Sequence, residues 1–182
     1  GELLLMLSSA GTCTVETACE NPIRLVESGP AGGVAASAAY ARATGTERVL
    51  SFDMGGTTAK VCFIDDGEPR VTREFEVARM WRFRRGSGLP IIVPVLELIE
   101  IGAGGGSIAH IDRMGLPKVG PESAGSEPGP ACYGRGGDRP TVTDANLLLG
   151  YLDAGYFLGG SMALDADAAR AAVRRHVAEP LA

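Results

Sequence analysis

Residues 49–64 read VLSFDMGGTTAKVCFI, and this stretch carries the fold prediction. Two short apolar segments, Arg48–Phe52 and Val61–Ile64, are typical of buried strands. Between them, Asp53–Lys60 combines an aspartate, two glycines, two threonines and a lysine. Glycines allow a tight turn in which successive backbone N–H groups converge on phosphate oxygens. The pattern therefore predicts a phosphate-binding turn between two strands, with an ordinary hairpin turn as the alternative.

Each polar residue of this turn has a predicted task. Lys60 neutralises a phosphate as a point charge. Asp53 holds Mg²⁺, directly or through water, or orients an attacking nucleophile, and these two residues are the predicted catalytic pair. The motif GxxxxGK[ST] is absent, so this is not a Walker loop. Backbone and hydroxyl donors for the phosphates are expected from Gly55, Gly56, Thr57 and Thr58.

A second glycine block, GAGGGS (102–107), follows an apolar run and resembles GxGxxG with a serine in the third place. A dinucleotide-binding fold would need an acidic residue about 20 positions further on, at the end of a second strand. Glu127 lies in that range, but within a proline- and glycine-rich segment. We therefore expect this block to line a nucleotide or substrate cleft, with a structural turn as the alternative. Its predicted binding residues are Gly104, Gly105, Gly106 and Ser107.

Composition narrows the class of protein. Glycine accounts for 26 of the 182 residues, roughly twice the usual share of about 7%. The net charge of −5 and pI near 5.1 exclude a basic field that would recruit nucleic acid or an anionic membrane surface. No apolar run approaches the roughly 18 residues of a membrane span. The four cysteines form no CxxC pair, which favours reduced thiols in a cytoplasmic protein and makes a zinc site improbable.

The order of predicted elements indicates an α/β fold. An antiparallel meander and three helices are expected, with residues 117–140 as a long functional loop. The strands are predicted at residues 48–52, 61–64 and 70–77, and the helices at 33–44, 143–152 and 165–178.

Three further features carry open alternatives. Glu27, at the entrance of the first predicted helix, is either a functional carboxylate or helix punctuation. Cys132 is expected to be a buried thiol, because no histidine is near it in sequence, with a nucleophile as the alternative. The arginines between residues 79 and 85 form a solvated loop, with an anion-binding role as the alternative.

The turn at 51–60 resembles the second phosphate loop of the actin, heat-shock-chaperone and sugar-kinase ATPase superfamily. Five blocks in order also resemble the hydantoinase/oxoprolinase family, of the N-methylhydantoinase A type, to which the acetone carboxylase beta subunit is related. They are IRLVESGPAGGV (23–34), SFDMGGTTAK (51–60), IEIGAGGGSIA (99–109), VGPESAGSEPGPACYGRGG (119–137) and PTVTDANLLLGYL (140–152). One departure is Ala10, where the family commonly has glycine.

The resemblance implies an α/β fold that is one lobe of an actin-like, two-lobed ATPase. Residues 1–182 would then form a single partial domain, the lobe with the second phosphate loop, and the N-terminal lobe would be absent. The expected cofactors are ATP and Mg²⁺. The piece alone is expected to show no meaningful turnover above a Lys60→Ala control.

The implied activity is ATP-dependent opening of a cyclic amide, such as a hydantoin or 5-oxoproline, with a hydantoinase B-type partner subunit. The resemblance leaves two alternatives: an ATP-binding subunit of an acetone-type carboxylase, or a truncated, non-catalytic nucleotide-binding lobe.

Overall fold

The chain forms two compact units in a computed structural model, which describes residues 1–77, 80 and 86–182. Unit 1 contains Gly1–Asp53 and Lys60–Ile99. Unit 2 contains Met54–Ala59 and Glu100–Ala182. The chain thus enters unit 2 for one short loop, returns to unit 1, and enters unit 2 again. The assignment of residues 1–182 to a single partial domain stays a prediction.

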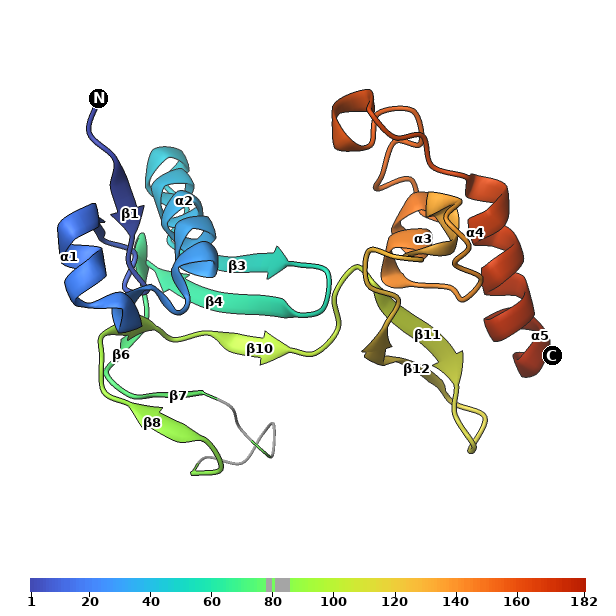
Figure 1. Cartoon of the computed structure of the whole chain (residues 1–182), viewed down its shortest axis with the longest axis horizontal. Coiled ribbons are helices and arrows are strands. Elements are labelled where there is room, and N and C mark those ends of the chain that lie inside the picture. The colour runs from blue at the N-terminus through green and yellow to red at the C-terminus, as the bar shows by residue number, and fades with distance from the viewer. Residues whose placement is uncertain (78–79, 81–85) are drawn as a thin grey trace. The chain divides into compact units, whose positions relative to one another are not determined.

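Unit 1 combines short strands with one long helix (Figure 1). A 3-10 turn at Pro22–Leu25 precedes the long helix. In chain order the other elements are β1 (Leu4–Met6), β2 (Thr12–Thr14), α1 (Val15–Glu20), α2 (Ser28–Thr44), β3 (Arg48–Met54), β4 (Ala59–Asp65), β5 (Glu68–Pro69), β6 (Val71–Thr72), β7 (Phe75–Val77), β8 (Leu89–Ile91), β9 (Val95–Leu96) and β10 (Ile99–Ile101).

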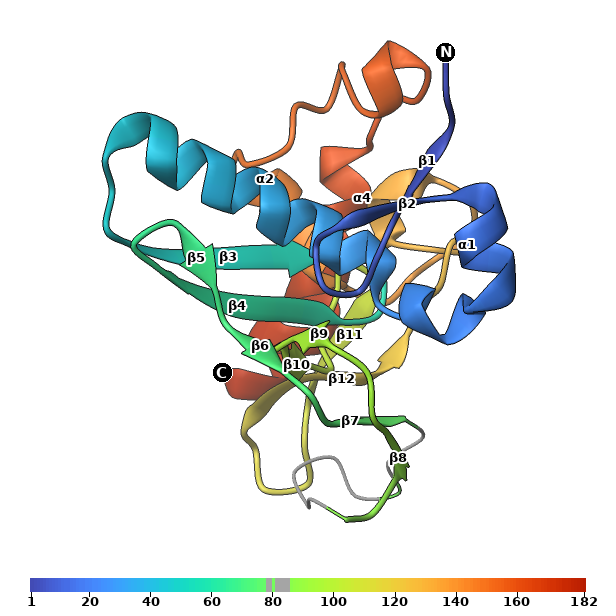
Figure 2. The same ribbon diagram turned by 90° about the vertical axis from the view of Figure 1, so that its left-hand side faces the viewer.

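Helix α2 packs along one side of β3 and β4 (Figure 2). Its buried face carries small residues, which let the helix backbone approach the sheet closely. The helix ends at Gly45, whose φ of 65° is left-handed and whose N–H donates to the carbonyls of Ala41 and Arg42. It begins at Ser28, five residues before the predicted start at residue 33. The segment GPAGG (29–33) therefore belongs to the first part of the helix.

The core of unit 1 lies between this helix and the sheet. Its buried members come from α2, β4 and β9, and Ser37 of the helix also donates its hydroxyl hydrogen to Ser51 of β3 at 3.1 Å. The cluster contains Ala31, Val34, Ala38, Cys62, Ile64 and Leu96.

The predicted meander is confirmed in its first hairpin and wrong in its third strand. Strands β3 and β4 are neighbours, but the sheet order is β10-β4-β3, with β5 on β4. Residues 70–77 instead form β6 and β7, which pair antiparallel with β9 and β8. The alternating pattern of these residues predicts a strand but not its pairing partner, which lies 12 to 25 positions further along the chain.

Unit 2 contains a β-hairpin and a set of helices. Residues 117–123, expected to be part of a loop, form a strand that pairs antiparallel with β11. The sequence pattern did not predict this strand, because proline and glycine are typical of turns and loops. A 3-10 turn lies at Ala131–Tyr133, another at Leu158–Gly160, and a π-helical turn at Arg174–Ala178. The other elements are β11 (Ser107–Ile111), β12 (Pro117–Ser123), α3 (Val142–Leu148), α4 (Ala166–Val173) and α5 (Glu179–Leu181).

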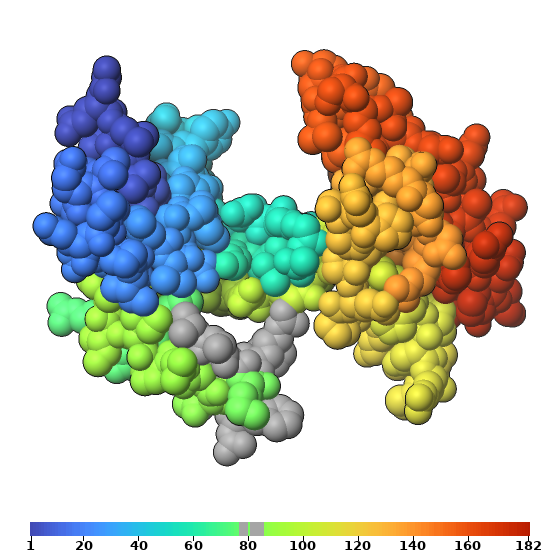
Figure 3. Space-filling view, in the orientation of Figure 1, coloured from blue at the N-terminus to red at the C-terminus, as the bar shows by residue number. Residues whose placement is uncertain are grey.

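The two predicted helix starts in unit 2 are confirmed. Thr141 caps α3 in a reciprocal capping box with Asp144, and Asp165 caps α4 by accepting from two backbone N–H groups. A second apolar cluster, which includes Cys132 and Leu147, lies beneath these helices. The segments that make up this core run from yellow to red in the space-filling view (Figure 3). No helix in the described part of the chain has the length and apolar character needed to cross a membrane.

Candidate functional site

The turn that joins β3 to β4 is tight and exposed. The Gly55 N–H donates to the Thr58 carbonyl at 2.9 Å and closes the turn. Gly55, Gly56 and Thr57 are exposed, and Thr58 is half-buried. Residues 54–59, called here the 54–59 loop, belong to unit 2.

Three other backbone donors of the loop have no partner among the described residues. Among the described residues, no group accepts a hydrogen bond from the backbone N–H of Gly56, Thr57 or Thr58. The two threonine hydroxyls also have no partner there. A turn that leaves consecutive N–H groups unpaired and exposed is a concave donor site of the kind that binds anions.

Gly56 has no structural reason to be glycine within the described chain. A Cβ placed on it would meet nothing within 4 Å, and its φ lies outside the left-handed region. A residue with a side chain would therefore fit the fold. Glycine at such a position is typical of a backbone that a ligand approaches closely.

The second glycine block packs directly against this loop, within unit 2. A Cβ on Gly104 would lie 2.5 Å from the Thr57 nitrogen and 2.6 Å from the Gly55 carbonyl oxygen. A Cβ on Gly106 would lie 2.8 Å from the Ser123 hydroxyl and 3.1 Å from the Gly56 carbonyl oxygen. The contacts of Gly104 are with backbone atoms and are closer than a real Cβ tolerates, so the fold requires glycine at this position. The closest contact of Gly106 is with a side-chain hydroxyl that can move, so the requirement there is weaker.

Hydrogen bonds extend this support from helix α3 to the loop. The N–H groups of Gly105 and Gly106 donate to the carbonyls of Gly55 and Gly56 at 2.9 and 2.8 Å. The Gly105 carbonyl in turn accepts from the backbone and the hydroxyl of Thr143, both at 2.9 Å. Thr143 is a supporting residue that sequence reasoning missed. A threonine early in a helix gives no signal that it binds a glycine loop 38 residues away.

The backbone contacts of the second glycine block, residues 104–107, bear on its predicted role in lining a cleft. The Gly104 N–H donates to the Ser107 hydroxyl at 2.9 Å, and the Ser107 N–H donates to the Gly104 carbonyl at 3.0 Å. Ser107 is fully buried. The N–H groups from Gly104 to Ser107 are therefore all used within the protein, and the role that the geometry supports is to hold the 54–59 loop. Direct contact of this block with a nucleotide stays a prediction.

Asp53, the last residue of unit 1 before the loop, carries an exposed carboxylate. It makes no hydrogen bond or ion pair within the described residues. A Cβ on Gly33 would lie 3.8 Å from its Oδ2 atom, which places the carboxylate beside α2. No group of three or more metal-ligating side chains lies within the described part of the chain. One free carboxylate nevertheless fits Mg²⁺, which usually keeps several waters and takes its other ligands from substrate phosphates.

Lys60, the first residue of unit 1 after the loop, is already paired. Its Nζ atom lies 2.5 Å from Oε2 of Glu27, and the two side chains are only 19% and 18% exposed. A contact between Lys60 and a phosphate would require the ammonium to leave this partner, so the predicted phosphate role stays a prediction. Glu27 occupies the N-cap position of α2, but its side chain makes no capping hydrogen bond. Glu27 therefore marks the helix start through its backbone, as one alternative predicted, while its carboxylate pairs with Lys60; a functional role for this carboxylate stays a prediction.

Cys132 is confirmed as a structural thiol. It is fully buried, and burial together with the nearby Asp144 carboxylate raises its pKa to about 12. A thiol that stays protonated and buried is not a nucleophile. Asp144 is itself fully buried and accepts from the N–H groups of Cys132 and Thr141, both at 2.7 Å, and from the Thr141 hydroxyl.

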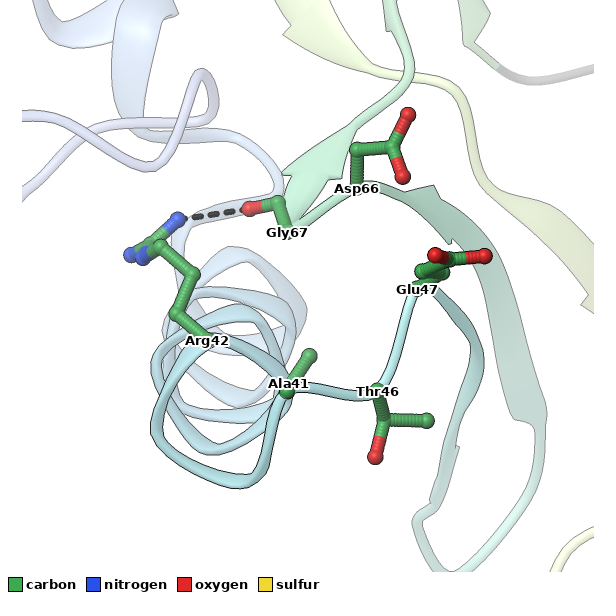
Figure 4. A pocket seen from close by; sticks show the side chains of 7 residues that line it. Ala41, Arg42, Thr46, Glu47, Asp66 and Gly67 are labelled. Atoms are coloured by element: carbon green, nitrogen blue, oxygen red, sulfur yellow. Dashed lines mark hydrogen bonds between the residues drawn. The ribbon is translucent and has the colours of Figure 1, made fainter.

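A hollow of about 220 Å³ lies elsewhere in unit 1, between the end of α2 and the turn after β4 (Figure 4). Arg42 lines it and donates a hydrogen bond to the Gly67 carbonyl. None of the predicted site residues contributes to its lining, which consists of Ala41, Arg42, Gly45, Thr46, Glu47, Asp66 and Gly67. The predicted arginine loop, with Arg79, Arg82, Arg84 and Arg85, lies outside the described residues.

Two enzymes of known name resemble the chain in sequence. It is 44% identical over 162 residues to the caprolactamase subunit alpha of Pseudomonas jessenii, covering 89% of the chain and 22% of that protein. It is 36% identical over 172 residues to a 5-oxoprolinase of Dictyostelium discoideum, covering 86% of the chain and 12% of that protein. The chain thus spans at most about a quarter of the length of these relatives.

Solved structures agree with the sequence relatives. The nucleotide-free structure of acetone carboxylase, from work on ATP-dependent acetone carboxylation, superposes with a TM-score of 0.76 and 28% identity over 99% of the chain and 24% of the neighbour. The ATP-dependent caprolactamase from Pseudomonas jessenii gives a TM-score of 0.67 and 43% identity over 87% of the chain and 22% of the neighbour.

The family model described as hydantoinase/oxoprolinase matches residues 1–182, the whole chain. The five motif blocks that indicate this family in the sequence therefore agree with the match over the full length. The chain belongs to the hydantoinase/oxoprolinase family.

Proposed function

We propose that this chain supplies one phosphate-binding loop of an ATP-dependent hydrolase that opens a cyclic amide. The observation that carries the proposal is the 54–59 loop, which is exposed and leaves three successive backbone N–H groups without partners in the part of the chain that the structure describes. The open space beside Gly56 supports the same conclusion, because a phosphate oxygen can approach there. We further propose that the fold is one lobe of an actin-like, two-lobed ATPase.

The chemistry begins from the poor reactivity of amides. Resonance makes an amide carbonyl a weak electrophile, and transfer of the γ-phosphoryl group of ATP to the amide oxygen releases ADP and creates a leaving group. Water can then attack the carbon, so that the ring C–N bond breaks, the nitrogen takes up a proton and an acyl phosphate remains. A second water hydrolyses this acyl phosphate to carboxylate and inorganic phosphate. Catalysis of phosphoryl transfer consists mainly of positioning and charge neutralisation.

Each part of the site has a proposed task. The N–H groups of Gly56, Thr57 and Thr58 bind phosphate oxygens, and the two threonine hydroxyls add donors. Asp53 would hold Mg²⁺, which supplies positive charge to the transferred phosphoryl group when bound. The names of the relatives support the substrate class, since caprolactamase and 5-oxoprolinase both carry the name of a cyclic amide. Three relatives are also named as subunits, which supports a partner of the hydantoinase B type.

A carboxylase subunit is the second candidate, supported by the likeness to acetone carboxylase over 99% of the chain. In that function ATP would activate a ketone and bicarbonate. The two candidates are distinguished by measuring ATP hydrolysis by the whole enzyme in the presence of lactams, hydantoins or ketones. Stimulation by a lactam or a hydantoin supports the hydrolase, and stimulation by a ketone supports the carboxylase.

The loop itself is tested by calorimetric titration of the chain with ADP and ATP in the presence of Mg²⁺. We expect binding in the wild type and in Cys132→Ala, which changes a buried thiol of unit 2, and loss of binding in Asp53→Ala. Equal affinity in Asp53→Ala and the wild type would contradict the proposal.

A further inference from the structure

Three charged side chains lie at the two ends of the 54–59 loop, all within unit 1. Asp53 comes before the loop and Lys60 after it, on the neighbouring strands β3 and β4. Both side chains face α2: Asp53 lies beside Gly33, and Lys60 contacts Glu27 at the start of the helix. One ammonium group therefore has two carboxylates on the same side of the sheet.

Of these two carboxylates, Lys60 pairs with the one that belongs to Glu27. Lys60 pairs with Glu27 at 2.5 Å, and the Asp53 carboxylate makes no ion pair or hydrogen bond with any described residue. The pair with Glu27 is about four-fifths buried, where charges are screened less than in water. The exposed Asp53 is the weaker competitor, because exposed ion pairs contribute little.

The backbone of Glu27 is fixed in place by a buried hydroxyl. The Glu27 N–H donates to the Ser8 Oγ atom at 3.2 Å, and the same hydroxyl donates to the Arg24 carbonyl at 2.7 Å. Ser8 is 1% exposed. Glu27 thus presents its carboxylate to Lys60 from an anchored position, and it does so instead of capping the helix that it precedes.

We propose that Glu27 is a positioning residue, which holds the Lys60 ammonium away from Asp53 and so leaves the Asp53 carboxylate free for the divalent cation that accompanies the phosphates. This inference rests on the proposed function of the loop. Side chains on one face of neighbouring strands lie within about 4.5–8 Å at their Cβ atoms, a span that a lysine side chain covers. Without the Glu27 charge, Lys60 would pair with Asp53 and occupy the oxygens that the cation needs.

The test measures how much Mg²⁺ improves ADP binding. The dissociation constant of ADP is determined with Mg²⁺ and with a chelator, and the ratio of the two values gives the metal-dependent gain. A direct contact between Lys60 and phosphate cancels in the ratio where it is equally strong with and without Mg²⁺, and the Lys60→Met change in the double variant removes it altogether. We expect Glu27→Gln to lower the gain about threefold, the effect of one exposed ion pair at Asp53.

The double variant Glu27→Gln/Lys60→Met is the decisive control. It removes the competing ammonium as well, so we expect its gain to return to the wild-type value. It also leaves no unpaired buried charge, which protects the fold against the loss that either single change brings. Thermal unfolding followed by circular dichroism confirms that each variant is folded at the temperature of the titration.

The outcomes separate the two proposals. If the wild type shows a gain that Asp53→Asn abolishes while Glu27→Gln leaves it unchanged, the role of Glu27 is overturned and the phosphate loop stands. If the double variant stays as low as Glu27→Gln, the restraint of Lys60 is also overturned. If the wild type shows no gain, or if Asp53→Asn retains it, the metal-binding role proposed for Asp53 fails, and the inference fails with it.

Discussion

The 54–59 loop and the glycine block at 104–106 use the same residue for different physical reasons. A side chain on Gly56 would point into open space, whereas a side chain on Gly104 would collide with the backbone of the loop. The free N–H groups lie in the loop, and those of the block are all engaged. One segment therefore presents donors, and the other holds that segment in shape.

The largest effect is expected from Gly104→Ala. The new Cβ would lie 2.5 Å from the Thr57 nitrogen, and only backbone atoms could move to relieve the contact. We expect the free energy of unfolding to fall by about 2 kcal/mol or more, the usual range for overpacking. Urea denaturation measures this change. A loss below about 0.5 kcal/mol would show that the block does not brace the loop.

Gly32→Ala is the matched control for that variant. Gly32 lies within α2, and a Cβ there meets nothing within 4 Å. Alanine should raise the free energy of unfolding by about 0.5–1 kcal/mol, because it restricts the unfolded chain and favours the helix.

The second-largest effect is expected from Gly56→Ala, which should weaken ADP binding without changing the stability of the fold. In Gly56→Ala the added methyl group has room in the fold, so the free energy of unfolding should stay within about 0.5 kcal/mol of the wild type. The same methyl group would keep a phosphate from the loop backbone. We expect ADP affinity to fall about tenfold, the loss of roughly one hydrogen bond to a charged group. Unchanged ADP affinity would contradict the claim that the 54–59 loop, unlike the glycine block, presents its backbone to a ligand.

The smallest effect is expected at Ala10, where the chain lacks a glycine that its backbone favours. Ala10 has a φ of 67°, in the left-handed region, and it packs at the edge of the unit 1 core. Ala10→Gly relieves the strain but loses the methyl contacts and adds backbone entropy, so a net gain below about 1 kcal/mol is expected in thermal unfolding. A loss above 1 kcal/mol would mean that the methyl contacts dominate.

Local chemistry made part of this structure predictable from sequence. The hairpin around residues 53–60 follows from two apolar segments that flank a glycine turn. The starts of the helices predicted at 143–152 and 165–178 were found, because Thr141 and Asp165 accept hydrogen bonds from the first N–H groups of these helices. Each of these features depends on residues only a few positions apart.

Contacts between residues far apart in the sequence could not be predicted. The Glu27–Lys60 ion pair joins residues 33 positions apart, and the contact of Gly104 with the loop spans about 50. No local pattern encodes either contact. The start of α2 was predicted too late because glycine and proline usually break helices, but Pro30 lies in the first turn, where its missing N–H is not needed.

The central claim is that the backbone N–H groups of the 54–59 loop hold phosphate oxygens. Amide chemical shifts measured by NMR during titration of the labelled chain with ADP and Mg²⁺ test it directly. We predict large shifts for Gly56, Thr57 and Thr58, with smaller shifts for the engaged amides of Gly105 and Gly106. Binding that shifts other amides and leaves these three unchanged would contradict the account.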